Sequence, residues 1–72
     1  MTDIDYAIER KRRQTAEVVA RKTGYTYSDV LYVLQKLGVH GNWTPEELNN
    51  RPVDYDELAE IVAEEIESFL PF

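Results

Sequence analysis

The chain offers few side chains that could act as catalytic nucleophiles or bases. It contains no cysteine, only two serines (Ser28 and Ser68) and one histidine, His40. Nucleophilic catalysis needs an activated nucleophile beside a base. We interpret Ser28 as a helix cap and His40 as a turn residue, while Ser68 lies among glutamates. The three glycines are scattered and form no phosphate-binding loop. The sequence therefore predicts a protein that is not an enzyme and has no cofactor.

Two groups of carboxylates could be taken for a metal site, Asp3 with Asp5 and the acids of residues 54–57. An EF-hand calcium loop needs a glycine at its sixth position, and counting from Asp54 that position is Ala59. Acidic residues in a first helical turn are expected from the helix dipole alone. We therefore predict no metal site.

The run of bases at residues 10–13 makes Arg10, Arg12 and Arg13 candidate nucleic-acid-binding residues. Consecutive helical residues spread around the whole circumference, however, and form no single basic face. Glu9 also stands four residues before Arg13, the favourable order for a helical ion pair, as Glu17 stands before Arg21. A solvated, salt-bridged face is thus favoured over a phosphate-binding one, and both interpretations stay open.

The last predicted helix is acidic on the side opposite its apolar stripe and contains no lysine or arginine. The candidate protein-binding residues there are Glu57, Glu60, Glu64 and Glu67. Like charges three or four residues apart destabilise a helix, and so do anions near its C-terminal end. Such a local conflict is typical of a functional surface. The face either serves solubility, partly neutralised by arginines of the first helix, or docks on a basic partner.

Aromatic residues are further candidates for a protein interface, where tyrosine and tryptophan are common anchors. Tyr32 is expected to point outward from its helix, and Phe72 to fold back or insert into a partner. Trp43 and Phe69 are expected to complete the small core.

Capping signals and apolar periodicity place these residues on four helices. We expect helices at residues 3–22, about 26–37, 45 to about 50, and 55–70, with glycines after the first two. The buried stripe of the second helix should contain Val30, Val33, Leu34 and Leu37. No segment alternates with period two, so the fold class is all-α. It should be a small bundle of three main helices and one short helix, with a helix-turn-helix-like N-terminal hairpin.

Residues 15–37 resemble the N-terminal helical hairpin of HU/IHF-type nucleoid proteins. The resemblance is carried by Val19-Ala20-Arg21-Lys22-Thr23-Gly24-Tyr25-Thr26, followed by Asp29-Val30 and Val33-Leu34. In that family the hairpin is the helical half of a dimer, and DNA is bound mainly by a β-sheet saddle and basic β-arms. This chain has no sequence for either. The resemblance implies a hairpin and a homodimer, and the DNA-binding role does not carry over.

Length and charge limit the remaining choices. The 72 residues form one predicted domain, 1–72, with no membrane span and a cytoplasmic location. The net charge is −6, and nine acids against one base follow residue 45. We predict a protein-binding regulator or inhibitor, a class that includes virus-encoded proteins, with a basic partner surface. The alternative is a DNA-associated protein using the basic first helix, and the third interpretation is an oligomerising structural subunit.

Overall fold

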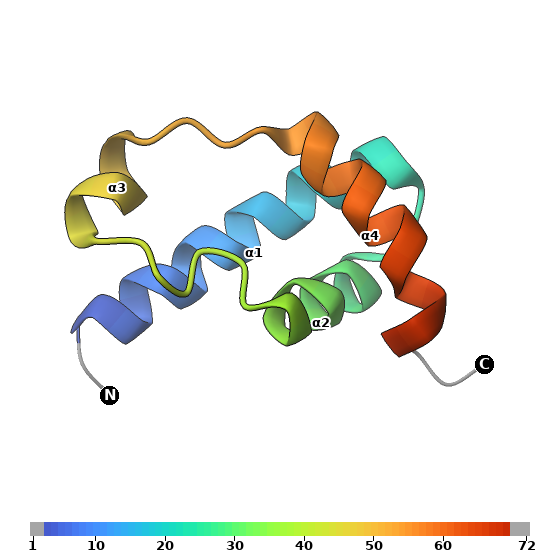
Figure 1. Ribbon diagram of the computed structural model, residues 1–72, viewed down its shortest axis with the longest axis horizontal. Helices are drawn as coiled ribbons and strands as arrows, with labels where there is room; N and C mark the ends of the chain where they lie inside the picture. The colour runs from blue at the N-terminus through green and yellow to red at the C-terminus, as the bar shows by residue number, and fades with distance from the viewer. Residues whose placement is uncertain (1–2, 70–72) are drawn as a thin grey trace.

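The computed structural model describes residues 3–69, and every regular element in that range is an α-helix. The four helices are α1 (Asp3–Thr23), α2 (Tyr27–Leu37), α3 (Pro45–Asn50) and α4 (Tyr55–Phe69), arranged as Figure 1 shows. The predicted all-α bundle of three main helices and one short helix is confirmed. Within residues 3–69, no helix is both long and apolar enough to cross a membrane.

Local signals set the boundaries of α2. The Thr26 side chain accepts a hydrogen bond of 3.3 Å from the Asp29 N–H at the start of the helix. Gly38 ends the helix in the left-handed conformation, with a φ of 71°, and its N–H donates to the Gln35 carbonyl. Glycine adopts this conformation without the steric penalty that a Cβ atom brings. The turn between α1 and α2 uses Gly24 in the same way, with a φ of 82°.

A complete capping box starts α3. The Glu47 N–H donates to Thr44 Oγ1 over 3.2 Å, and the Thr44 N–H donates to Glu47 Oε1 over 3.0 Å. The hydrogen bond from the Thr44 backbone holds the pKa of the Glu47 carboxyl below its ordinary value. At the start of α4, the Glu57 N–H donates to Asp54 Oδ1 over 3.1 Å. The predicted positions of both helix starts are therefore confirmed.

The apolar core lies where α1, α2 and α4 pack together. Its fully buried members are Ala16, Val19, Val30, Val33, Leu34, Val62 and Ile66. Phe69 packs against this core as predicted. Trp43 does not: this half-buried residue meets His40 in the loop and is not among the described residues that pack on the core. The prediction that Leu37 belongs to the buried stripe is wrong, because Leu37 remains 36% exposed. It is the last residue of α2, where the covering helices no longer enclose the stripe.

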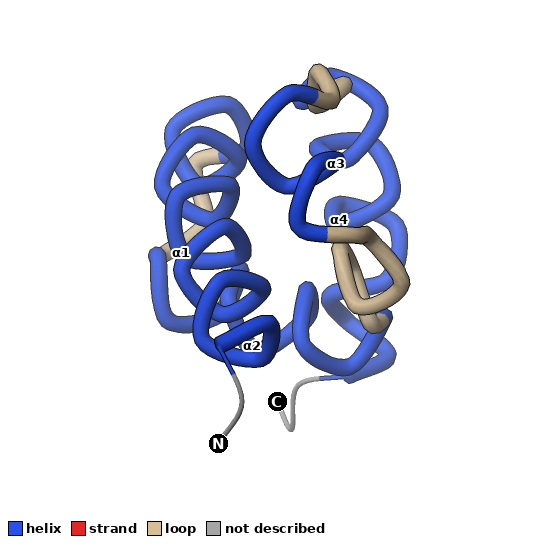
Figure 2. The backbone as a smooth tube through the Cα atoms, turned by 90° about the vertical axis from the view of Figure 1, so that its left-hand side faces the viewer, coloured by secondary structure: helices blue, strands red, loops and turns tan. Residues whose placement is uncertain are grey.

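The first half of α1 is covered by α3, which packs against it and buries Leu48. Figure 1 shows α3 and α4 toward opposite ends of α1, and the end-on view in Figure 2 shows α3 in front of α4. The loop between α2 and α3 crosses α1 and carries His40 and Trp43. α1 is thus covered by apolar packing toward one end and by α3 and this loop toward the other.

Candidate functional site

The outward side of α4 carries five exposed carboxylates, which we name the acidic face. Its members are Asp56, Glu57, Glu60, Glu64 and Glu67. Val62 and Ile66 are buried on the opposite side of the same helix, as the helical period requires. Among residues 3–69, the ion pair that reaches this face joins Lys22 Nζ to Asp56 Oδ1 over 2.8 Å. The predicted glutamates are therefore exposed together on one helix.

Of the two predicted aromatic residues, the structure describes Tyr32. Tyr32 is 39% exposed on α2, and its ring lies 5.3 Å from Lys36 Nζ in a cation–π contact. No hydrogen bond between Tyr32 and the carboxylates of α4 is found in the described part of the chain. Phe72 lies outside the described residues. Tyr32 therefore belongs to a separate surface, on α2.

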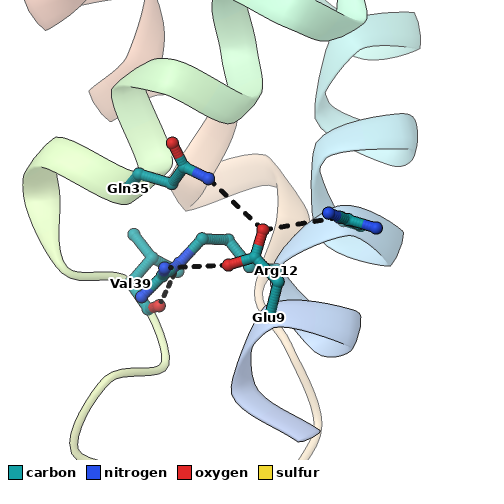
Figure 3. A network of polar contacts seen from close by, with 5 residues as sticks. Glu9, Arg12, Gln35 and Val39 are labelled. Atoms are coloured by element: carbon teal, nitrogen blue, oxygen red, sulfur yellow. Dashed lines mark hydrogen bonds and ion pairs between the residues drawn. The ribbon is translucent and has the colours of Figure 1, made fainter. Parts of the chain in front are cut away.

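The basic run of α1 is split by its own helical geometry. Arg12 has a side chain only 14% exposed, and its Nε donates to the Val39 carbonyl over 3.1 Å. Glu9 pairs with Arg12 over 3.5 Å and with Arg13 over 3.4 Å, and it accepts a hydrogen bond from Gln35. Figure 3 shows the Glu9 carboxylate between these partners. Arg12 and Arg13 are thus engaged within the protein.

Of the two helical ion pairs expected on α1, one is present. Glu9 pairs with Arg13, whereas a pair between Glu17 and Arg21 is not among those formed by residues 3–69. Arg10, the third candidate, has no carboxylate partner in this range either. It lines a groove between α1 and α3 with a volume of about 370 Å³. Arg10 and Arg13 also line a second groove on α1 together, beside Glu9 and Glu17, whereas Arg12 is bonded to Val39.

The sequence interpretation missed the burial of His40. Its left-handed backbone, with a φ of 65°, fits the predicted turn, but the residue is only 5% exposed. Its Nε2 shares a hydrogen bond of 2.8 Å with Oγ1 of the fully buried Thr15. The ring also meets Trp43 edge to face, with centroids 4.3 Å apart. The only sequence signal was Thr15, a polar residue within the apolar stripe of α1.

Burial, reinforced by the positive charges of Lys11, Arg12 and Arg51, lowers the pKa of His40 to about 4. The imidazole is therefore neutral at neutral pH, and Nδ1 has no hydrogen-bond partner within residues 3–69. Arg51 lies over the Trp43 ring, 4.6 Å from its centroid. A nucleophile and base must reach a substrate atom to act on it. Because Thr15 and His40 are both enclosed, this pair holds the loop against α1.

Neither metal-ligand geometry nor a known relative identifies a function. Among residues 3–69, no group of three histidine or carboxylate side chains could hold a metal ion. No protein-family model, curated protein or solved structure matches the chain. The resemblance of residues 15–37 to the nucleoid-protein hairpin therefore stays a prediction.

Proposed function

We propose that the protein is a non-enzymatic, protein-binding modulator whose acidic face docks on a basic surface of a partner protein. The observation that carries this proposal is the concentration of exposed carboxylates on α4 with a single described ion pair, Lys22–Asp56. Oppositely charged surfaces steer association and select partners. A helix of this composition provides such a surface on a rigid element.

The energetics of α4 support a role other than stability. Asp56 and Glu60 stand four residues apart, as do Glu60 and Glu64, and each such like-charged pair costs a few tenths of a kcal/mol. Glu64 and Glu67 also lie in the last two turns, where the helix dipole disfavours anions. The last turn of α4 contains no basic residue. Substitution to neutral residues would remove these costs.

Most bases of α1 lie away from α4, and Lys22 is the base that pairs with the acidic face among residues 3–69. The run at residues 10–13 lies on the half of α1 that α3 covers, while α4 packs nearer the other end (Figure 1). Arg12 and Arg13 are paired with Glu9. Internal pairing would require these arginines to reach α4. Glu57, Glu60, Glu64 and Glu67 form no ion pair within residues 3–69, which supports the proposal that this face meets another molecule.

Capture from native cytoplasmic extract, treated with nuclease, tests the proposal with three immobilised proteins. These are the wild type, the triple variant Glu60→Gln/Glu64→Gln/Glu67→Gln, and a control with the same change in net charge. The control is Asp3→Asn/Glu17→Gln/Glu46→Gln, whose sites are exposed and lie outside α4.

We expect a protein that the wild type and the control retain and the α4 variant loses. With that protein purified, the α4 variant should associate more slowly and with a weaker dependence on salt, since the acidic face supplies the steering. Equal capture and equal association rates for the α4 variant and the control would refute docking through this face.

A further inference from the structure

The groove between α1 and α3 is the second charged surface that the fold constructs. Its lining residues are Tyr6, Ala7, Arg10, Lys11 and Gln14 from α1, with Leu48 and Asn49 from α3. It therefore exists only because α3 packs against the first half of α1. The groove combines two cations, two amide side chains and an exposed aromatic ring.

The cations of this groove differ from their neighbours on α1. Arg12 and Arg13 both pair with Glu9. By contrast, no ion pair or side-chain hydrogen bond within residues 3–69 involves Arg10 or Lys11. Beside them Tyr6 is 63% exposed. An exposed aromatic ring next to unpaired cations suits a partner that brings carboxylates and some apolar surface.

We propose that this groove binds the acidic face of a second copy of the chain. The charges are complementary: Arg10 and Lys11 line the groove, and the acidic face presents five carboxylates. The amides of Gln14 and Asn49 can donate further hydrogen bonds to carboxylate oxygens. The groove lies at the α3 end of α1, and the chain's own α4 packs toward the opposite end (Figure 1). The contact is therefore between molecules.

Self-association through this contact rests on the proposed docking role of the acidic face, and it names one partner for that face. When the groove of one copy binds the acidic face of another, the copies form either a reciprocal dimer or a head-to-tail chain. The net charge of −6 opposes close approach of two copies. Association is therefore weak. Salt screens both this repulsion and the local attraction between the groove and α4, so the site-specific variants identify the contact at each ionic strength.

Sedimentation equilibrium of the full chain at low and high ionic strength tests the proposal. The groove variant Arg10→Gln/Lys11→Gln and the α4 variant Glu60→Gln/Glu64→Gln/Glu67→Gln should each lower the self-association constant by about tenfold or more. The control Arg21→Gln/Lys36→Gln removes two positive charges at exposed sites outside the groove and should retain association. Circular dichroism verifies that each variant is folded.

Mixing provides the sharpest result, because each defective variant keeps the surface that the other lacks. An equimolar mixture of the groove and α4 variants should form a complex that neither forms alone. Three results would overturn the proposal: a wild type that is monomeric at both ionic strengths, a groove variant that associates normally, or a mixture that stays monomeric. A monomeric wild type that binds duplex DNA through Arg10 and Lys11 would assign the groove to nucleic acid instead. Capture of another protein by the acidic face is measured in a separate experiment. The proposal of self-association and the proposal of docking on a partner protein can therefore fail independently.

Discussion

The two ends of α1 are held in place by different kinds of interaction. Toward its C-terminal end, Ala16 and Val19 are fully buried against α2 and α4 in the apolar core. From the middle of α1 toward its N-terminal end, the covering loop is fixed by polar contacts, with Arg12 bonded to Val39 and Thr15 bonded to His40. Apolar burial is roughly proportional to area and non-directional, whereas a buried polar contact depends on both partners. The two ends should therefore respond differently to substitution and to pH.

The largest effect is expected in the apolar core. Leu34→Ala should lower the free energy of unfolding by about 2–5 kcal/mol, because it removes a fully buried side chain and leaves a cavity. Chemical denaturation monitored by circular dichroism measures this loss. Leu37→Ala is the matched control on the same helix, and its partly exposed side chain should cost less than about 1 kcal/mol. Equal losses at the two sites would mean that the core is wrongly assigned.

The next largest effect is a dependence on pH that belongs to the polar end. His40 has a pKa of about 4 in the folded protein, below the ordinary value of 6.5 that applies to the unfolded chain. The unfolded chain thus binds the proton first as pH falls. Stability from neutral His40 is complete above pH 6.5 and is lost progressively down to about pH 4, for about 3 kcal/mol in total.

The His40→Asn variant isolates this contribution, since asparagine tolerates the left-handed backbone and does not titrate in this range. The free energy of unfolding is measured for both proteins between pH 7 and pH 4. We expect the wild type to lose more stability than the variant across that interval. Parallel pH profiles for the two proteins would show that His40 is protonated equally in the folded and unfolded states.

A smaller effect separates two neighbouring arginines. Arg12→Gln should cost about 1–3 kcal/mol, because it removes the hydrogen bond to the Val39 carbonyl and leaves Glu9 with one fewer cation. Arg13→Gln breaks an exposed ion pair and should cost less than about 1 kcal/mol. Thermal or chemical unfolding compares them directly. A reversed order would remove Arg12 from its role in fixing the loop.

The same contrast explains what the sequence could predict. Helix boundaries follow from short-range signals, such as the Thr44–Glu47 capping box and Gly38, whose partners lie within a few residues. The exposure of the acidic face follows from the helical period. Both kinds of information are local, and they were predicted correctly.

The polar end of α1 depends on contacts between residues far apart in the chain. Thr15 and His40 are 25 residues apart, and Arg12 and Val39 are 27 apart. No periodicity in one segment specifies such a pairing. The groove was missed for the same reason, because Arg10 and Asn49 share it only once α3 has packed on α1. The amino-acid composition likewise did not decide whether the arginines of α1 form ion pairs with the carboxylates of α4.

The smallest expected effect tests the central claim, that the acidic face is unpaired within the chain and available to a partner. The measurement is the free energy of unfolding of Glu60→Gln/Glu64→Gln/Glu67→Gln at low ionic strength, compared with Asp3→Asn/Glu17→Gln/Glu46→Gln. The α4 variant should be more stable than the wild type by a few tenths of a kcal/mol per site, since repulsion and an unfavourable dipole contact are removed. The control removes an acid near the start of α1 and another at the start of α3, so it should show no such gain. A less stable α4 variant would contradict the account, because those glutamates would then be paired within the folded chain.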